Sequence, residues 1–446
     1  MQRANFSRVG FILAAAGAAV GLGNIWKFPY MTGMYGGGAF VLVYLITILF
    51  IGVSLLIAEM LMGKMGGSDA VSSFEKEAPR HKWAWAKAGY LFFIGLIIMT
   101  FYSVVIGWIF YYIYLTLTGS LPSSMEDAQN IFNHLYHNSW MIQVILHAIS
   151  VVIVGYILQK GIKGGIEKFN LILMPLLIVI LLGLCLYAST FGGFSKALSF
   201  LFVPDFSKLN SEAIIRAVGH SFFTLSIGIG SIMAYAASLP KSANIFRSGL
   251  WVAFLDTFIA LLAGVVIFSF LFEFGSEPAK GPGLVFMSLP IIFVKLGFVG
   301  TIVALLFFLG MAFAGLTSAI SLVEPTVMYL ERRKGISKKV AVWGSSFFYF
   351  AIGILMILSV SDGFKEYLMI GKKSLFDAVE FAVDSFLMPL GGILIALFVG
   401  YAMNKEAVKD ALKYEMGETI FKIWYFSIRY IAPLAVLFLS YNALTS

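Results

Sequence analysis

The sequence predicts an all-α integral membrane protein with about eleven transmembrane helices, built as a five-plus-five inverted repeat. The first observation is composition: of 446 residues, 60% are hydrophobic and 12% are charged, and the mean hydropathy is +0.92. A soluble domain carries about 25% charged residues, so this chain could not cover itself with water-facing groups. The second observation is a series of long apolar segments, and the third is a glycine motif that occurs twice.

The apolar segments are long enough to cross a bilayer, which takes about 20 residues of helix. We expect spans at residues 9–34, 38–63, 88–118, 139–159, 168–190, 212–238, 246–272, 297–330, 338–360, 381–403 and 419–443. No long polar insertion separates them, which predicts a single transmembrane domain over residues 1–446.

Basic residues are divided unevenly between alternate loops. With the N-terminus in the cytoplasm, 21 lysines and arginines fall in cytoplasmic loops and 7 in outer loops. Cytoplasmic loops typically carry this excess, so we expect a cytoplasmic N-terminus and, after eleven spans, an outer C-terminus. The same bias accounts for the net charge of +8. We therefore expect the lipid bilayer as the surrounding partner, with no nucleic acid and no obligate protein partner.

A short glycine motif is repeated 207 positions apart, as VGLGNI at residues 20–25 and IGIGSI at residues 227–232. The copies fall in predicted helices 1 and 6. A unit of five helices is odd-numbered, so a second copy enters the membrane in the opposite sense, as in inverted-repeat transporters. We expect a first repeat over 9–190, a second over 212–403 and an extra helix at 419–443. Glycine allows the chain to unwind at mid-membrane, although a single GxG could also serve only close helix packing.

Further motifs accompany this repeat. They are AAVGLGNIWKFPY (18–30), YGGGAF (35–40), GHSFFTLSIGIGS (219–231), FAGLTSAISLVEP (313–325) and the pair Gly165 and Pro175. Together they resemble the neurotransmitter:sodium symporter family, and most closely its bacterial amino-acid branch with eleven spans. The resemblance covers nearly the whole chain and implies a location in the bacterial inner (plasma) membrane.

The resemblance implies two sodium sites. At the first site the implied ligands are Ala19, Asn24, Thr224 and Asp256, together with the carboxylate of the substrate. At the second site they are Gly17, Val20, Ala314, Thr317 and Ser318. Sodium is a hard cation that prefers oxygen ligands, as calcium and magnesium do. The alternative for the two hydroxyls is a bond to the carbonyl four residues earlier in their own helix.

The resemblance also implies a substrate pocket between the interrupted helices. Its expected residues are Ala18, Ala19, Leu22, Gly23, Ile98, Tyr102, Phe223, Thr224, Ser226, Ile229, Ser318 and Leu322. Tyr102 would bind the substrate carboxylate and Phe223 would be the lid, while core packing is the alternative for the apolar residues. No side chain of this set is charged, and Ala18 stands where animal monoamine carriers have an acid. A charged substrate side chain would be buried without a partner, at a cost of several kcal/mol.

Two gates follow from the same resemblance. At the outer gate Lys27 would pair with Glu380, with Asp384 and Asp377 as rivals, or it would only extend to the membrane interface. At the inner gate Arg3 would pair with Glu331, because Arg332 occupies the usual acid position.

The helix 7 sequence bears on chloride. The position that carries a glutamate in chloride-independent relatives is Ala260 here, but Asp256 lies one turn earlier on the same face. We expect Asp256 to replace the anion, so that chloride is not required. A bound anion near Tyr44 and His220 is the rival interpretation.

These expectations describe a sodium-coupled symporter that imports a neutral, apolar L-amino acid by alternating access with two sodium ions. The alternatives are a sodium-coupled carrier of another small zwitterion, amine or osmolyte, or an ion channel. The five histidines show no metal-ligand spacing and no Ser–His–Asp arrangement is compelling. We therefore expect no enzyme activity and no organic cofactor.

Overall fold

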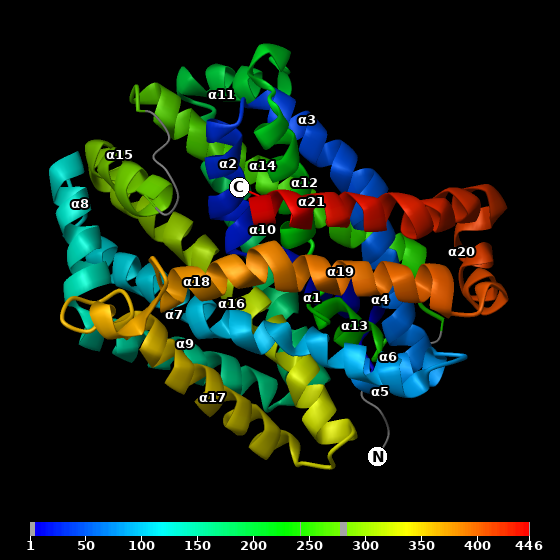
Figure 1. Ribbon diagram of the computed structural model, residues 1–446. Coiled ribbons are helices and arrows are strands. Elements are labelled where there is room, and N and C mark those ends of the chain that lie inside the picture. Colours follow the sequence, from blue (N-terminus) through cyan, green and yellow to red (C-terminus); the bar gives the residue numbers. More distant parts are fainter. Residues whose placement is uncertain (1–4, 241, 277–282, 446) are drawn as a thin grey trace.

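The computed structural model describes residues 5–240, 242–276 and 283–445, and its regular elements are almost all helical (Figure 1). Within the described residues, nine continuous helices are long and apolar enough to cross a membrane, and one bent pair adds a tenth. A further crossing, over residues 211–236, is divided into two shorter helices. The predicted all-α membrane fold with about eleven helices is confirmed.

The first half of the chain contains α1 (Arg8–Ala19), α2 (Phe28–Met34), α3 (Gly38–Thr47), α4 (Val53–Gly66), α5 (Ala70–Glu77), α6 (Lys82–Ala88), α7 (Ile94–Leu117), α8 (Met125–Asn133), α9 (Trp140–Leu158), α10 (Lys168–Ala188) and α11 (Gly193–Phe202). The second half contains α12 (Ser211–Thr224), α13 (Ser231–Ala236), α14 (Ile245–Glu273), α15 (Leu289–Lys295), α16 (Gly297–Arg332), α17 (Lys338–Leu358), β1 (Met369–Ile370), β2 (Lys373–Ser374), α18 (Leu375–Ala382), α19 (Met388–Leu397), α20 (Lys405–Phe426) and α21 (Ala432–Thr445).

Short helical turns of other types connect many of these elements. The π-helical turns are Gly23–Lys27, Ile48–Gly52, His134–Asn138, Ile162–Glu167, Leu284–Ser288, Val383–Leu387, Phe398–Ala402 and Ser427–Ile431, and the 3₁₀ turns are Gly89–Phe93, Phe206–Lys208 and Lys365–Leu368. The last crossing begins at a kink in α20, where Gly417 has φ 74° and ψ 168°. This agrees with the predicted start of a span at residue 419. The repeat boundaries 9–190 and 212–403 stay a prediction.

The two interrupted helices lie in the interior of the molecule. α1 contacts α10, α13, α14 and α16, and α13 also contacts α4. In Figure 1 both α1 and α13 are enclosed by longer helices. Their breaks are therefore covered on several sides by protein, and irregular backbone at membrane depth is tolerated where it is buried in this way or lines a water-filled cavity.

The sequence explains where these helices stop. α1 begins at Ser7, whose hydroxyl accepts the N–H of Gly10 at 3.0 Å, and ends where Val20 adopts an extended conformation. α12 and α13 are separated by residues 225–230, in which Gly228 and Gly230 have φ of 80° and 88°. These backbone angles are accessible to glycine at no steric cost. The breaks predicted at mid-helix from the two glycine motifs are thus observed.

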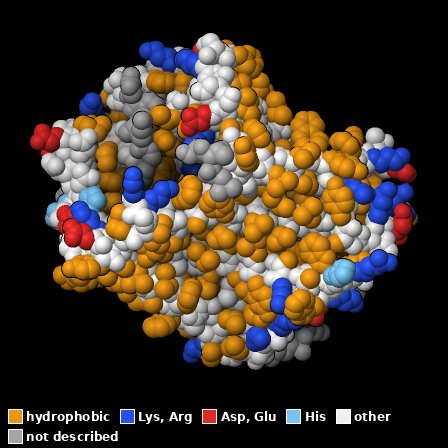
Figure 2. Space-filling model, viewed as in Figure 1, with side chains coloured by type: hydrophobic (Ala, Val, Ile, Leu, Met, Phe, Trp, Pro, Cys, Tyr) orange, Lys and Arg blue, Asp and Glu red, His pale blue; other side chains and the backbone are white. Residues whose placement is uncertain are grey.

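The outer surface is suited to lipid. Figure 2 shows a broad hydrophobic area over α19 and α21, with charged side chains gathered toward the two ends of the molecule. Leu390, Leu434 and Phe438 are about half exposed on these helices. A soluble protein rarely exposes so much contiguous apolar surface, so this area is the expected lipid contact.

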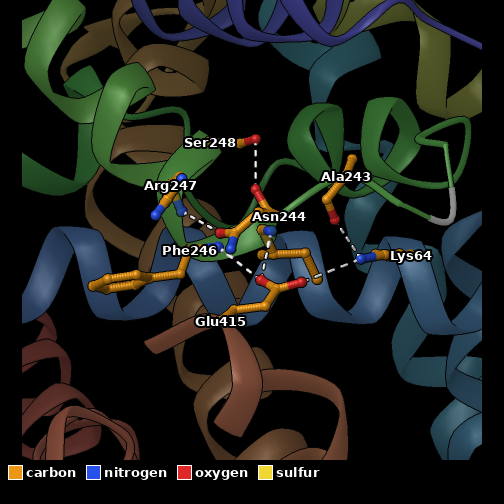
Figure 3. A network of polar contacts seen from close by, with 8 residues as sticks. Lys64, Ala243, Asn244, Phe246, Arg247, Ser248 and Glu415 are labelled. Carbon is orange, nitrogen blue, oxygen red and sulfur yellow. Dashed lines mark hydrogen bonds and ion pairs between the residues drawn. The ribbon is translucent and has the colours of Figure 1, made fainter. Parts of the chain in front are cut away.

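The first part of α20 is tied to two other helices through Glu415 (Figure 3). One carboxylate oxygen accepts the N–H groups of Ile245 (2.6 Å) and Phe246 (3.1 Å) at the start of α14. The other lies 3.4 Å from Nζ of Lys64, which also donates to the carbonyl of Ala243 at 2.6 Å. A carboxylate at a helix N-terminus is favourable because free N–H groups and the helix dipole both face it. Glu415 therefore holds the ends of α4, α14 and α20 together.

Candidate functional site

Three of the four predicted ligands of the first sodium site lie in contact, although they come from three separate helices. The amide Nδ2 of Asn24 lies 2.7 Å from Asp256 Oδ1 and 3.1 Å from the Thr224 hydroxyl. The Thr224 hydroxyl lies 3.0 and 3.1 Å from the two carboxylate oxygens of Asp256. All three side chains are buried. The fourth, Ala19, is the last residue of α1, at the edge of the break.

The donor set fits a hard monovalent cation. Asp256 is a buried carboxylate, and among the described residues no lysine or arginine forms an ion pair with it. A buried charge is costly unless it is paired. The Thr224 hydroxyl and the Asp256 carboxylate supply oxygens at one point with one net negative charge, as a sodium ion prefers. Asn24 turns its Nδ2 toward them, and its Oδ1 accepts the N–H of Gly21 at 3.0 Å.

The second predicted set gathers around Ser318 of α16. Its hydroxyl lies 3.1 Å from the carbonyl of Gly17 and 3.0 Å from that of Val20, both at the break after α1. Thr317 bonds the carbonyls of Phe313 and Ala314 in its own helix, each at 3.0 Å. This is the alternative that the sequence left open for Thr317. Ser318 instead faces the broken helix, so its oxygen and two main-chain carbonyls are already grouped.

Asn170 was missed by the sequence interpretation. Its Nδ2 donates to the carbonyl of Ile166 at 2.9 Å, which orients the amide and leaves Oδ1 buried without a partner. That oxygen lies against Gly17, at a distance that leaves no room for a side chain there. An additional amide oxygen therefore borders the second set. A lone asparagine in an apolar helix carries no motif that could have identified it.

The predicted substrate residues surround the same breaks. The N–H of Leu22 donates to the Tyr102 hydroxyl at 3.2 Å, and the Ser226 hydroxyl donates to the carbonyl of Ala18 at 2.8 Å. Tyr102 thus satisfies a main-chain group that the interrupted helix leaves free. The predicted apolar residues Ile98, Ile229 and Leu322 are buried nearby in the core.

A cavity of about 370 Å³ opens beside Tyr102 and Phe223. Its lining is mostly aromatic and comprises Leu22, Gly23, Trp26, Lys27, Tyr30, Phe101, Tyr102, Val105, Trp108, Phe132, Tyr136, Phe223, Phe376, Asp377 and Glu380. Four predicted substrate residues belong to this set, whereas Ile98, Ile229 and Leu322 do not. Sites of this size and composition are typical for small organic molecules.

The outer gate differs from the predicted pairing. Lys27 forms an ion pair with Asp384, not with Glu380, although Glu380 lines the neighbouring cavity. Nζ of Lys27 also lies 4.1 Å from the centroid of the Phe223 ring, in cation–π geometry. The π-helical turn Val383–Leu387 widens the helix at this point and presents Asp384 to Lys27. The pair closes over the predicted lid residue.

We expect Asp384→Asn to slow uptake several-fold more than Glu380→Gln does, because only Asp384 contacts the ammonium group. Uptake rates of the two variants in reconstituted vesicles measure this. Sodium affinity should be unchanged in both, since neither belongs to the two oxygen sets. A larger loss of uptake in Glu380→Gln would show that Glu380 is the gate partner of Lys27.

The inner end contains several charged residues, and only one member of the predicted pair is described. Arg3 lies outside the described residues, so its pairing with Glu331 stays untested. Glu331 lies 3.8 Å from Nζ of Lys338, and the buried Glu324 lies 3.4 Å from the same atom. Arg332 donates to the carbonyl of Gly67 and to the Ser238 hydroxyl.

The N-terminal segment reaches this inner region. The N–H of Phe6 donates to the carbonyl of Ser238 at 3.1 Å, and its ring lies 5.5 Å from that of Tyr235. Ser7 bonds Glu167 through both its N–H (3.0 Å) and its hydroxyl (2.5 Å). The start of α1 is therefore fixed to α13 on one side and to the turn before α10 on the other.

Glu59 of α4 supports the break between α12 and α13. Its two carboxylate oxygens each accept an N–H at 3.1 Å, from Gly228 and Gly230, and one is 3.4 Å from the N–H of Met233. The side chain is fully buried. The spacing of residues in the sequence offers no signal for this role.

Tyr44 and His220 form a second polar group behind the first sodium set. Their ring centroids are 5.5 Å apart, and the Tyr44 hydroxyl and both ring nitrogens of His220 are buried without partners. Ala260 is also fully buried and contributes no polar atom there. Two unpartnered donors leave the predicted rival anion position chemically possible.

Comparisons with known proteins agree with this arrangement. The profile of the sodium:neurotransmitter symporter family matches residues 3–136 and 124–446. The crystal structure of MhsT in complex with L-phenylalanine is similar with a TM-score of 0.89 and 39% identity, covering 99% of this chain and 100% of that one. The uncharacterized sodium-dependent transporter YhdH of Bacillus subtilis is 35% identical over 98% of this chain and 96% of its own length. An uncharacterized sodium-dependent transporter of Haemophilus influenzae is 34% identical, with 97% and 96% covered.

Proposed function

The chain belongs to the sodium:neurotransmitter symporter family, and from this premise we propose that it imports a neutral, apolar L-amino acid together with two sodium ions. It is a multi-pass membrane transporter with a small-molecule substrate. The observation that carries the proposal is the grouping of two oxygen sets and Tyr102 around the breaks of the two central helices. The proposed orientation has the N-terminus in the cytoplasm and the C-terminus outside.

The chemistry of the pocket supports the class of cargo. An amino acid has a carboxylate and an ammonium group that need polar partners. The main-chain groups of Ala18 and Leu22, which bond the side chains of Ser226 and Tyr102 at the break, are of this kind. The residues proposed for the side-chain pocket are apolar, and burial of an apolar side chain contributes about 25 cal/mol per Å². The structure of MhsT, which is 39% identical, contains L-phenylalanine.

The gates support alternating access. On the outer side the ion pair of Lys27 and Asp384 lies over Phe223, and on the inner side Phe6 and Arg332 both bond Ser238. A carrier needs contacts of this kind on both sides, because only one path opens at a time. Sodium bound beside Asp256 would favour the state in which the oxygen sets are assembled, which couples the ion to the substrate.

Uptake into vesicles tests the proposal. With labelled L-phenylalanine and an inward sodium gradient, uptake should be saturable and should fall at least tenfold when choline replaces sodium. Unlabelled leucine, methionine, tyrosine and tryptophan should compete, whereas γ-aminobutyrate and betaine should not. If only γ-aminobutyrate and betaine compete, the cargo is another small zwitterion, amine or osmolyte. A sodium current that does not saturate and accumulates no substrate would indicate a channel.

A further inference from the structure

Arg429 is a cation in the last membrane crossing, and no acidic residue within the described ranges forms an ion pair with it. It lies in the turn Ser427–Ile431, eleven residues beyond Glu418, and none of the ion pairs among the described residues includes it. Its Nε is buried without a hydrogen-bond partner. Charged side chains within a span are costly and are normally paired or directed to water.

The groups around this guanidinium are aromatic. Its central carbon lies 4.6 Å from the centroid of the Tyr401 ring and 5.8 Å from that of Tyr430. Tyr425 is the other polar side chain that interacts with it. Phenol groups are neutral at physiological pH, so none of them compensates the positive charge.

Arg429 is partly exposed and lies beside the end of a neighbouring crossing. It packs against Gly400, close to the end of the tenth crossing, after which the chain turns at Met403 into the polar first part of α20. Tyr401 and Tyr430 are about half exposed, and so is Phe426 one turn earlier. In the proposed orientation Arg429 lies in the cytoplasmic half of the predicted 419–443 span, and an arginine at this depth extends its side chain toward the headgroups of the cytoplasmic leaflet.

From these observations we propose that the guanidinium of Arg429 binds the phosphodiester headgroup of an anionic phospholipid at the cytoplasmic end of helices 10 and 11. The rings of Tyr401 and Tyr430 flank the guanidinium, and the Tyr401 hydroxyl donates to the carbonyl of Arg429 at 2.7 Å. A guanidinium forms strong charge-assisted hydrogen bonds with phosphate oxygens, and tyrosine at this level suits the interface between acyl chains and headgroups. The hydrophobic surface of α19 and α21 beside it would contact the acyl chains (Figure 2).

The test uses the full chain, delipidated in detergent and titrated with phosphatidylglycerol or phosphatidylcholine. Lipid retention is counted by native mass spectrometry, and the melting temperature is followed in parallel. The wild type should retain phosphatidylglycerol in preference to phosphatidylcholine. Arg429→Gln should bind phosphatidylglycerol about fivefold more weakly, which is the effect expected for one basic residue near an anionic lipid.

Lys422→Gln is the matched control. Lys422 lies two turns earlier on the same helical face, is largely exposed and already pairs with Glu418 at 3.5 Å. Its removal should leave phosphatidylglycerol binding unchanged. An equal loss in Lys422→Gln, or no loss in Arg429→Gln, would overturn the proposal. Inorganic phosphate at the same concentration should not raise the melting temperature, and a comparable rise would show a site for the free anion instead.

Arg429→Lys keeps the proposal testable if Arg429→Gln fails to fold. A lysine retains the charge but lacks the two-pronged donor geometry, so its affinity for phosphatidylglycerol should fall between those of the wild type and the glutamine variant. If Arg429→Lys binds both lipids as tightly as the wild type does, the guanidinium does not form a phosphate site.

Discussion

Asp256→Asn should raise the sodium concentration needed for half-maximal uptake by at least about tenfold, because it removes the charge that the protein supplies to the first oxygen set. The carboxylate is fully buried and lies within 2.7–3.1 Å of Asn24 and Thr224. Attraction between two unit charges about 4 Å apart is of order 4 kcal/mol at an effective dielectric near 20, before desolvation. Half of that energy, about 2 kcal/mol, already exceeds the roughly 1.4 kcal/mol that corresponds to a tenfold change in sodium affinity.

The same variant tests the chloride hypothesis. Two sodium ions with a zwitterion leave excess positive charge, and Asp256 supplies a negative charge that an anion would otherwise provide. Wild-type uptake should therefore be equal in gluconate and chloride buffers, whereas Asp256→Asn should gain from added chloride. The pair Tyr44 and His220 offers the unpartnered donors that such an anion would need.

Asp69→Asn provides the control. Asp69 is another buried acid, but its carboxylate caps α5 by accepting the N–H of Ser72 at 3.0 Å, far along the chain from the breaks. Asparagine caps a helix about as well as aspartate, so this substitution should change stability little and leave sodium affinity unchanged. Wild-type uptake that collapses without chloride would falsify the view that Asp256 replaces the anion.

Much of the fold could be predicted from the sequence because the membrane imposes simple rules. Segment length and hydropathy identified the spans, and the repeated GLG and GIG motifs marked the two interruptions at residues 20–25 and 227–232. These features depend on local composition and on glycine's conformational freedom. Three side chains of the first oxygen set could be identified through the family resemblance, and they lie in contact.

The contacts that close the gates could not be predicted, because they depend on the rotation of a helix. Glu380 and Asp384 are one turn apart on the same face, and sequence spacing does not distinguish them. The π-helical turn that begins at Val383 decides in favour of Asp384. Glu415 was missed because it accepts main-chain N–H groups far away in the sequence, and main-chain partners leave no residue pattern to recognise. Asn170 was missed because its place beside Gly17 depends on how two helices pack.

Glu59→Gln should abolish most transport and destabilise the protein, because Glu59 holds the break of the sixth helix in its irregular conformation. Both carboxylate oxygens accept backbone N–H groups, and Gly228 and Gly230 have positive φ. An amide presents one NH₂ group to these donors, so one backbone N–H loses its acceptor. Removing one partner of a buried charged hydrogen-bond group typically costs about 2–4 kcal/mol.

The effect on function should exceed the effect on stability. The break carries Ser226 and follows Thr224, so a change in its backbone disturbs both the substrate pocket and the first oxygen set. We expect a more than tenfold loss of maximal uptake together with a lower melting temperature in detergent. Thr47→Ala is the control: it removes a hydroxyl from the crossing that carries Glu59, and this hydroxyl bonds the carbonyl of Val43 in its own helix. The substitution should change neither the maximal uptake nor the melting temperature appreciably. Full uptake by Glu59→Gln would show that the glycine backbone holds the break without this carboxylate.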